Sequence, residues 1–460
     1  MNPERVIDAH VGVVGAGPGG MVAGAMLANA GVSVVVLDEG HRPGGQIFRQ
    51  LPEGAANRGQ IAEPPSHHQG QQLTGVFAGA GVAVRNGATV WDAKPGRLWF
   101  EQCGESWLLR CERIVLAPGA YDRCIPFPGW TLPGVLTAGA LQVMVRGFGV
   151  VPGRRALVVG SGPLLLPTVT SLLSAGVKVV AALEASSRLG AVKALPGVIG
   201  NRSRLREAAW YARKLLAAGV RLRWGWTVFA CEGDGRVQRA VIGKVGRDGR
   251  PRRDTARTIE VDVVGAGFGL VPSVELGLRL GCGSRFDAAR GGHCLTVDAE
   301  QRTSVAGVFA AGEICGIGGA EVAMAEGQVA AAAILRDLRG TPVPDALRRR
   351  AAAERRASDA MLRAFAPLPG LHELAQPDTI VCRCEDVPLQ RARQAAALHG
   401  SSLRAIKVGC RAGMGPCQAR ICGPSLQALA TGRPVAMDVP VVQVPVKPVC
   451  SATIVSAPPG

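Results

Sequence analysis

Four cysteines near the C-terminal end of the chain have the spacing of a metal centre. Cys382 and Cys384 form a Cys-x-Cys pair, and Cys417 and Cys422 follow after 32 intervening residues. Four thiolates suit either a [2Fe–2S] cluster or zinc, but zinc sites prefer two residues between paired cysteines. We therefore predict a [2Fe–2S] cluster with these four ligands. Cys410 is a rival for the fourth position, and we interpret it as a spare thiol.

A glycine turn near the N-terminus has the sequence of a phosphate-binding loop. The turn Gly15-Ala-Gly-Pro-Gly-Gly20 lies between two β-branched runs and opens an Ala-rich helical segment. Gly15 makes the tight turn, Gly17 lets a pyrophosphate approach the backbone, and Gly20 lets helix and strand pack closely. Asp38 ends the second run, where it can accept a hydrogen bond from an adenosine ribose. We predict a dinucleotide site; a membrane span fits poorly because residues 12–24 contain six glycines.

A second acid follows a glycine much later in the chain, at Gly312-Glu313. An apolar strand is predicted to end there, and a helix to begin near Gly319. The Glu313 carboxylate can accept hydrogen bonds from the ribityl hydroxyls of a flavin. The start of the helix offers N–H groups and a positive dipole end to the region of the flavin O2 atom. These features predict the other end of one FAD site.

A second βαβ pattern runs from Arg155 to Glu184. Gly160 and Gly162 match the first two glycines of the turn, and Glu184 matches the ribose acid. Leu165 stands where the third glycine belongs, so helix and strand are expected to lie further apart. The pattern predicts a Rossmann-like fold, and it leaves open a weakly bound adenine nucleotide, ATP or NAD.

The composition limits the class of protein. The 460 residues have room for about three domains, and 47% of them are hydrophobic. The formal charge of +17 comes mainly from 45 arginines, but no basic run is interleaved with aromatic residues, so nucleic-acid binding is not expected. The thirteen cysteines and the absence of an apolar leader in residues 1–8 favour a reducing compartment. We expect a cytoplasmic protein without a transmembrane segment and leave open a peripheral place in an inner-membrane complex.

These motifs resemble one family over nearly the whole chain. The most specific of them are the sequences at 43–46, 127–134, 160–165, 311–313 and 413–418. The chain resembles the FAD-containing subunit of heteromeric amino-acid and opine dehydrogenases. That family includes the A-type subunit of opine oxidase, α-type subunits of D-hydroxyproline and L-proline dehydrogenases, and the B-type subunit of hydrogen cyanide synthase. Its C-terminal module looks like a bacterioferritin-associated-ferredoxin-type [2Fe–2S] domain, whose cysteines map onto the four ligands predicted above.

The resemblance implies an α/β fold with two Rossmann-like domains, the second inserted in the first, and a small α-rich iron–sulfur domain. The FAD domain would comprise residues 1–150 and 286–340, with the inserted domain at 151–285 between them. A linker helix at 341–378 would lead to the iron–sulfur domain at 379–435. Residues 436–460 would form a tail, in which 444–449 resemble a closing strand. The predicted cofactor-binding residues are Gly15, Ala16, Gly17, Pro18, Gly19, Gly20, Asp38, Glu39, Gly45, Gln46, Val90, Ala117, Gly119, Gly312, Glu313, Gly319, Gly160, Gly162 and Glu184.

The resemblance also implies that this chain transfers electrons, because in such complexes a separate FAD subunit oxidises the amine or amino acid. The expected partner is that catalytic dehydrogenase or oxidase β subunit, with a small ferredoxin-like subunit left open. We find no His, Tyr and Arg constellation typical of an amino-acid carboxylate clamp with a base, so no catalytic residue is predicted. The alternatives are a self-contained NAD(P)H-dependent FAD/[2Fe–2S] reductase and a cysteine module that serves only as a structural or docking element.

Overall fold

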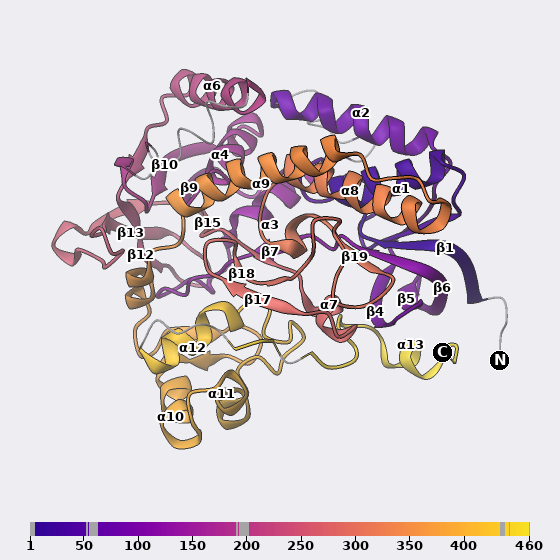
Figure 1. The fold of residues 1–460 in the computed structure, drawn as a ribbon. Coiled ribbons are helices and arrows are strands. Elements are labelled where there is room, and N and C mark those ends of the chain that lie inside the picture. The colour runs from indigo at the N-terminus through magenta and orange to yellow at the C-terminus, as the bar shows by residue number, and fades with distance from the viewer. Residues whose placement is uncertain are drawn as a thin grey trace.

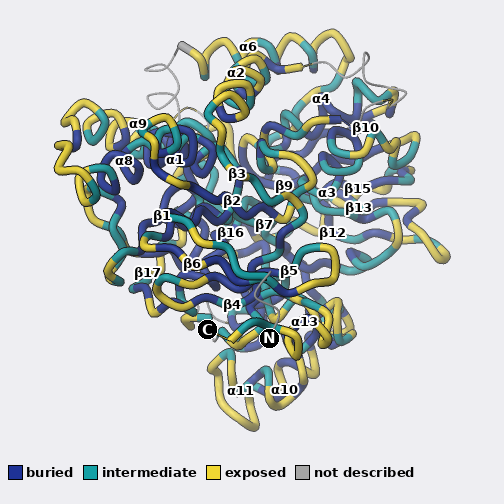
Figure 2. The backbone as a smooth tube through the Cα atoms, turned by 90° about the vertical axis from the view of Figure 1, so that its right-hand side faces the viewer, coloured by how far each residue is buried: buried dark blue, intermediate teal, exposed yellow. Residues whose placement is uncertain are grey.

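The structure, a computed structural model, contains two large sheets, several small ones and a helical C-terminal module (Figure 1). Buried strands fill the middle of the molecule, and most exposed residues lie on the outer helices and loops (Figure 2). The residues that the structure describes are 5–51, 54, 63–189, 192, 202–432, 438–440 and 442–459.

The first sheet carries the N-terminal glycine turn. Its strands lie in the order β3-β2-β1-β6-β5-β4, and β19 pairs with β6. β3, β2, β1, β6 and β19 pair in parallel, whereas β6, β5 and β4 form an antiparallel meander. The strands are β1 Val6–Val14, β2 Val34–Asp38, β3 Ala83–Asn86, β4 Thr89–Lys94, β5 Arg97–Gln102, β6 Glu105–Leu116 and β19 Val308–Ala310. The helices packed beside it are α1 Pro18–Asn29, α2 Pro65–Gly79 and α8 Ala320–Arg339.

Glycines let α1 and α8 approach each other closely. A Cβ on Gly327 would lie 2.3 Å from the Gly19 carbonyl oxygen, and one on Gly19 would lie 3.0 Å from the Ala323 oxygen. Half of the buried residues of α8 are alanines. The first turn of α1 therefore rests directly on α8, and this contact joins two parts of the FAD domain that are far apart in sequence.

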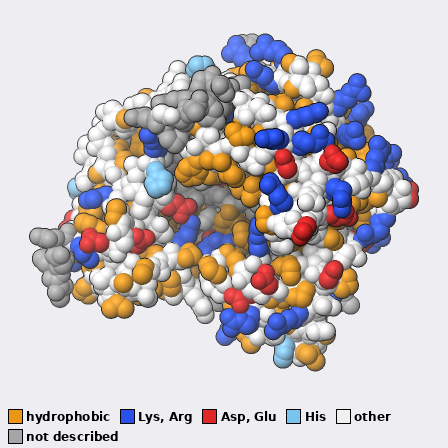
Figure 3. Space-filling view, turned by 180° about the vertical axis from the view of Figure 1, so that it is seen from behind, with side chains coloured by type: hydrophobic (Ala, Val, Ile, Leu, Met, Phe, Trp, Pro, Cys, Tyr) orange, Lys and Arg blue, Asp and Glu red, His pale blue; other side chains and the backbone are white. Residues whose placement is uncertain are grey.

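The second sheet has the strand order β11-β10-β9-β15-β8, all parallel, and a separate antiparallel sheet β12-β13-β14 lies beside it. The strands are β8 Val135–Thr137, β9 Arg155–Gly160, β10 Lys178–Glu184, β11 Leu222–Trp224, β12 Trp226–Glu232, β13 Arg239–Lys244, β14 Arg257–Glu260 and β15 Val263–Gly267. The helical elements are α3 Ala138–Gln142, the π-helix η2 Val143–Gly147, α4 Leu165–Ser174, α6 Arg202–Ala217 and η3 Arg253–Thr255. Lys and Arg side chains gather over this side of the molecule in Figure 3, and a hollow lies near the middle of the same face.

Short elements connect the two sheets. The glycine-rich stretch after Asp262 forms β15 and then β16, which pairs with β7 in an antiparallel ladder, so the chain returns here to the FAD domain. The connecting elements are β7 Ala120–Asp122, β16 Leu270–Pro272, α7 Glu275–Arg279, β17 Ser284–Asp287, β18 Gly292–Leu295 and η4 Gly312–Cys315.

A long helix, α9, leads to the cysteine module, which we define as residues 379–432. Figure 1 shows α9 running along α8, with the cysteine module at the bottom of the view. The module has its own core, in which Leu389, Ile406 and Leu426 are fully buried. The elements are α9 Asp345–Ala364, η5 Pro369–Leu374, β20 Ile380–Cys382, β21 Val387–Pro388, α10 Leu389–His399, α11 Leu403–Cys410, α12 Gly423–Thr431 and, in the tail, α13 Ser451–Val455.

The predicted fold class is confirmed, with two Rossmann-like sheets and an α-rich C-terminal module. One helix is not apparent from the sequence, and one local expectation is wrong. α2 begins at Pro65 in a stretch rich in proline and histidine, because its prolines occupy the start of a helix, where no N–H is needed. The closing strand expected at 444–449 is not formed; Val446 N donates one hydrogen bond to the Trp91 oxygen at 2.8 Å. No helix in the described ranges is long and apolar enough to cross a membrane.

Candidate functional site

The first glycine turn is tight at both ends and open in the middle. Gly15 has φ +98°, and a Cβ there would lie 2.2 Å from the Ala117 oxygen. A Cβ on Gly20 would lie 1.9 Å from the Gly15 oxygen. A Cβ on Gly17 would meet only Gly45 Cα, at 4.0 Å. The two outer glycines are therefore required by packing, and Gly17 is the glycine that faces open space, as a pyrophosphate loop requires.

Asp38 is held against this turn at the end of β2. Its carboxylate, 9% exposed, accepts hydrogen bonds from the backbone N–H groups of Ala16 and Gly40. Burial raises the pKa of Asp38, and these two N–H groups oppose the shift. The neighbouring Glu39 is exposed and forms an ion pair with Lys447 of the tail at 2.7 Å. Asp38 is thus at the position of a ribose acceptor, while Glu39 ties the tail to the FAD domain.

The glycine pair at 44–45 lies directly over the first turn. Gly44 N donates to the Ala16 oxygen at 2.9 Å. Gly45 has φ +60°, and a Cβ on it would lie 2.8 Å from Gly17 Cα. Gln46 accepts a hydrogen bond from Arg49, whose pKa burial lowers to about 10. The structure therefore brings the Pro-Gly-Gly-Gln segment to the open side of the pyrophosphate loop.

Two further predicted residues lie where β6 ends. Ala117 N donates to the Val14 oxygen at 2.8 Å, and the Gly119 oxygen accepts from Ser273 N at 3.1 Å. Gly119 has φ +78°, which favours glycine. Val90 is buried in the core cluster that also contains Leu37, one residue before Asp38. These contacts place the three residues around the carboxyl ends of the first sheet.

Glu313 bonds to the start of α8 rather than pointing away from it. Its carboxylate accepts from Gly318 N at 3.1 Å and from Gly319 N at 2.7 Å. Burial raises the pKa of Glu313, and these N–H groups and Arg355 lower it. The acid and the helix start that the sequence assigned to one flavin are therefore adjacent, and they form one polar cluster beside Gly312.

Two residues of this cluster, Glu326 and Arg355, are not apparent from the sequence. Glu326 accepts from Gly312 N at 2.8 Å and pairs with Arg355 of α9 at 2.6 Å, and both side chains are at most 11% exposed. Arg355 also donates to the Gly316 and Ile317 oxygens. α9 is therefore more than a spacer, because its arginine supports the loop that carries Glu313. No local spacing could reveal this, since the partners lie on separate helices.

The second glycine turn is covered by the chain itself. Ser161 Oγ donates to the Phe365 oxygen at 2.9 Å, and a Cβ on Gly162 would lie 3.6 Å from Phe365 Cβ. Phe365 follows α9 directly and also contacts the Trp224 ring, with centroids 6.3 Å apart. Phe365 thus lies against the side of Gly162 from which a pyrophosphate would approach.

The other predicted features of the second turn are present. Glu184 is 2% exposed and accepts from Gly162 N at 2.8 Å. Burial raises its pKa. Gly160 has φ +158°, and a Cβ on it would lie 1.8 Å from the Gly267 oxygen. Leu165 begins α4 and is buried in the core. The geometry of a dinucleotide turn is therefore kept, although Leu165 replaces glycine.

The four predicted cysteine ligands lie together as two pairs. Cys382 and Cys422 lie close enough for each thiol to shift the pKa of the other, and Cys417 lies close enough to affect the pKa of Cys384. Gly413 N also donates to Cys382 Sγ at 3.3 Å. The pKa of Cys382 is lowered to about 6, and the nearby Cys422 thiol is the largest cause. In the described ranges, no three His, Cys, Asp or Glu side chains are grouped around one point as a single metal ion would require.

Cys410 stands apart from these pairs. It is 1% exposed, and its thiol donates to the Ile406 oxygen one turn back in α11 at 3.1 Å. Burial raises its pKa. This is the environment of a packed structural thiol.

The proline-rich crossing at residues 121–134 is the surface on which the cysteine module docks. Trp130 Nε1 donates to the Ile380 oxygen at 2.6 Å, and Ser425 Oγ of α12 donates to the Cys124 oxygen at 3.0 Å. Cys417 lies close enough to Cys124 to raise the pKa of that thiol, although burial is the main cause. The crossing thus leads from the end of β6 to the paired cysteines.

A buried polar chain makes a second link between the FAD domain and the cysteine module. Tyr121 OH donates to Glu275 at 2.7 Å, and Glu275 pairs with Arg420 at 3.1 Å. Arg420 also donates to the Cys417 oxygen at 3.1 Å. Burial, and then Glu275, raise the pKa of Tyr121 well above its ordinary value. In the sequence, Arg420 is recognisable only as a charge near the cysteines, and its partners are not apparent.

Comparison with known proteins agrees with this geometry. The chain is 32% identical to the A-type subunit of opine oxidase from Rhizobium meliloti over 91% of both chains. It is 29% identical to the HcnB subunit of hydrogen cyanide synthase from Pseudomonas aeruginosa over 89% of this chain and 90% of that one. L-proline dehydrogenase from P. horikoshii has the same fold, with a TM-score of 0.69 at 20% identity over 98% of this chain and 80% of that chain.

One protein family matches most of the chain as well. Residues 9–327, which include both glycine turns and Glu313, match the pyridine nucleotide-disulphide oxidoreductase family. The chain therefore belongs to this family, as an FAD-dependent oxidoreductase related to the A-type subunits of opine oxidase.

Proposed function

We propose that this chain is the flavin and iron–sulfur electron-transfer subunit of a heteromeric FAD-dependent amino-acid or secondary-amine dehydrogenase. A partner subunit would oxidise the substrate, which is of the hydroxyproline, proline, opine or glycine type. Two relatives that match about nine-tenths of the chain are described as subunits, one of opine oxidase and one of hydrogen cyanide synthase. These descriptions support a role in a multi-subunit enzyme.

FAD would lie along the first glycine turn and reach the cluster around Glu313. The open space beside Gly17 supports this placement, since the other glycines of the turn are packed against backbone. Asp38 would accept from the ribose, and the Pro-Gly-Gly-Gln segment would cover the pyrophosphate. Bound FAD supplies a centre that takes up two electrons and passes them on singly. The protein positions it through the contact of α1 with α8 and through Arg355.

The closeness of the four thiols is the observation that carries the proposal. A [2Fe–2S] cluster has two irons, and each takes two thiolates. Cys422 lies beside Cys382 and Cys417 lies beside Cys384, so they would supply two such sets. Zinc could use the same four sulfurs and is the competing metal. Gly413 N adds a hydrogen bond to one sulfur, which would tune a cluster's potential.

The main alternative is a self-contained NAD(P)H-dependent reductase. It requires a nucleotide on the second turn, with its pyrophosphate beside Gly162. Phe365 occupies that position and is held there by Ser161. We therefore propose that neither NAD(P)H nor another adenine nucleotide binds this turn in the folded chain, and that electrons enter from the partner subunit.

The proposed setting is a cytoplasmic complex of this chain with the catalytic β subunit. A small ferredoxin-like subunit and a peripheral place at the inner membrane are left open. Purification of the native complex and identification of its subunits would test this composition.

The function is tested by assaying the chain alone and together with its β subunit. We expect the purified single chain to give no substrate-dependent dye reduction with proline, hydroxyproline or an opine. The co-purified complex should reduce dye with one of these substrates at about 1–10³ s⁻¹, the usual range for enzymes. Turnover at such rates by the single chain would place the substrate site in this chain and overturn the proposal.

A further inference from the structure

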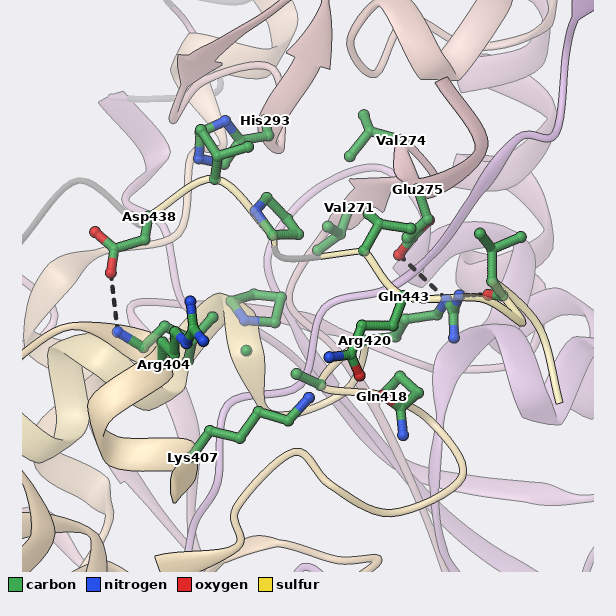
Figure 4. A pocket seen from close by; sticks show the side chains of 18 of the residues that line it. Val271, Val274, Glu275, His293, Arg404, Lys407, Gln418, Arg420, Asp438 and Gln443 are labelled. Carbon is green, nitrogen blue, oxygen red and sulfur yellow. Dashed lines mark hydrogen bonds and ion pairs between the residues drawn. The ribbon is translucent and has the colours of Figure 1, made fainter. Parts of the chain in front are cut away.

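A cavity of about 700 Å³ lies between the FAD domain and the cysteine module (Figure 4). Its walls come from three parts of the chain that are distant in sequence: β16 to β18 with Tyr121 of the crossing, the stretch from α11 to the start of α12, and tail residues 438–440, 442, 443, 445 and 446. Its volume is in the range of pockets that hold small organic molecules, which often lie at domain interfaces. None of the roles proposed above uses this cavity.

Most of the wall is apolar. The wall side chains without charge or hydrogen-bonding groups are Val271, Pro272, Val274, Leu403, Val408, Met414, Ala419, Pro424, Val439, Pro440, Val442, Pro445 and Val446. Such a wall favours the hydrocarbon part of a ligand over water.

The charges in the wall are unequal. Four cations line it, but only two carboxylates do, Glu275 and Asp438. Glu275 is already paired with Arg420, and Asp438 accepts from the N–H of Leu403 at 2.9 Å. Glu275 is thus already paired with a cation, and the Asp438 carboxylate is the one acid of the wall left to offset the other cations.

Arg404 and Lys407 are the two cations left over. They lie three residues apart on α11, so both project from one face of the helix. Within the described part of the chain, neither makes an ion pair, whereas Arg411 pairs with Glu385 at 3.0 Å. Figure 4 shows the Lys407 ammonium extending into the cavity on the side of Gln418. Two cations without an ion-pair partner among the described residues therefore border a mostly apolar space, and positive charge exceeds negative charge in the wall.

We propose that this cavity binds a small organic anion whose apolar body contacts the valine and proline walls and whose anionic group bonds Lys407 and Arg404. A neutral molecule would leave both cations unpaired, and an inorganic anion would leave the apolar wall unfilled. The bound molecule would contact the FAD domain and the stretch from Met414 to Arg420 at the same time. The proposal rests on the cavity alone and does not depend on the proposed electron transfer.

The test uses a matched pair of fluorescent probes on the full-length chain. 8-Anilino-1-naphthalenesulfonate carries an aromatic body and a sulfonate, and N-phenyl-1-naphthylamine has the same body without the charge. We expect the sulfonate to bind at least about tenfold more tightly, because two cations are available to it. Equal affinity for the two probes would overturn the proposal.

Variants then locate the binding site. Lys407→Ala should weaken binding of the sulfonate about fivefold, and the Arg404→Ala/Lys407→Ala double variant more strongly, with little change for the neutral probe. Arg391→Ala is the control, because Arg391 is an exposed cation on α10 of the same module and is absent from the cavity wall. Equal thermal unfolding would show that each variant is folded. Unchanged binding in the double variant, or an equal loss in the control, would contradict the assignment.

A competition experiment tests the chemical class of the ligand. 4-Phenylbutyrate should displace the bound sulfonate probe, and 4-phenylbutanol, which lacks only the charge, should not. Inorganic phosphate at the same concentration should displace less than the carboxylate, because it cannot use the apolar wall. Equal displacement by the alcohol, or stronger displacement by phosphate, would contradict an organic-anion site.

Discussion

Gly17 and Gly162 are the glycines at which a pyrophosphate would approach the two turns, yet different groups face them. A Cβ on Gly17 would meet only Gly45 Cα at 4.0 Å, whereas one on Gly162 would contact the Phe365 side chain. Gly17 also has φ −72°, which any residue can adopt, and Gly162 has φ +101°. A larger residue at 17 is therefore tolerated by the protein and disturbs only what binds there.

We expect Gly17→Val to give a folded protein that contains less than about a tenth of the wild-type flavin, because the side chain fills the pyrophosphate position. Flavin released from the purified protein, divided by protein concentration, measures this. Gly75→Ala is the control, since its Cβ on α2 would meet no atom within 4 Å. Full flavin content in Gly17→Val would show that the cofactor does not use this turn.

Arg355 gives a second prediction at the level of single residues. Arg355→Met leaves the buried Glu326 carboxylate without its partner, so the free energy of unfolding should fall by about 3–5 kcal/mol. Denaturant unfolding measures this, with exposed Arg356→Ala on the same helix as control. The double variant Glu326→Gln/Arg355→Met should recover much of the loss, because glutamine can still accept from Gly312 N.

The loss of folding stability in Arg355→Met should depend on pH. Burial already raises the pKa of Glu326 above its ordinary value, 4.5, and Arg355 opposes that shift. Without Arg355 the folded state would hold the proton more tightly than the unfolded state does, so stability falls as the pH rises above about 4.5. The deficit should therefore shrink as the pH is lowered from 7 toward 5. A deficit that is independent of pH, or a loss below 1 kcal/mol, would contradict the role given to this pair.

At the level of elements, α9 and the crossing at 121–134 have roles that their sequences do not reveal. The sequence of α9 predicts a linker helix. In the structure its Arg355 pairs with Glu326 beside the Glu313 loop, and Phe365, which follows the helix, contacts the second glycine turn. The prolines of the crossing predict a rigid connection, and the structure shows that Trp130 and Cys124 of this connection also bond to the cysteine module.

The sequence predicts those features of the fold and site whose residues lie close together along the chain. The two βαβ units, Asp38 and the four cysteines are recognisable because their chemistry depends on short spacings. Glu326, Tyr121 and the cover over Gly162 could not be predicted, because each depends on a partner brought from a distant segment by tertiary packing. Val446 shows the same limit, since its predicted strand is replaced by one hydrogen bond to Trp91.

Because Phe365 lies against Gly162 in the second glycine turn, we expect the chain to react poorly with nicotinamide cofactors. Stopped-flow mixing of the flavin-loaded chain with NADH or NADPH should show no fast bleaching of the flavin at micromolar cofactor. Phe365→Ala should still react slowly, because Leu165 remains in place of the third glycine and Ser161 remains able to hold the 365 backbone. Fast bleaching in the wild type would favour the self-contained reductase instead.

At the level of the whole molecule, the FAD domain and the cysteine module are held together at several points. The crossing begins next to Gly119 and passes Cys124, and the Tyr121, Glu275 and Arg420 chain runs beside it to Cys417. This arrangement places the paired thiols against the FAD domain rather than on a separate arm. The proposed electron transfer requires that these four thiols hold a redox-active cluster.

The most direct test is analysis of iron, zinc and acid-labile sulfide in the purified chain and in single Cys→Ser variants, together with EPR spectra of the reduced protein. We predict about two iron and two sulfide ions per chain and one EPR signal of a reduced [2Fe–2S] centre. Cys410→Ser should retain the cluster, and Cys417→Ser and Cys422→Ser should lose it. Stoichiometric zinc without sulfide, or loss in Cys410→Ser with retention in Cys422→Ser, would contradict the account.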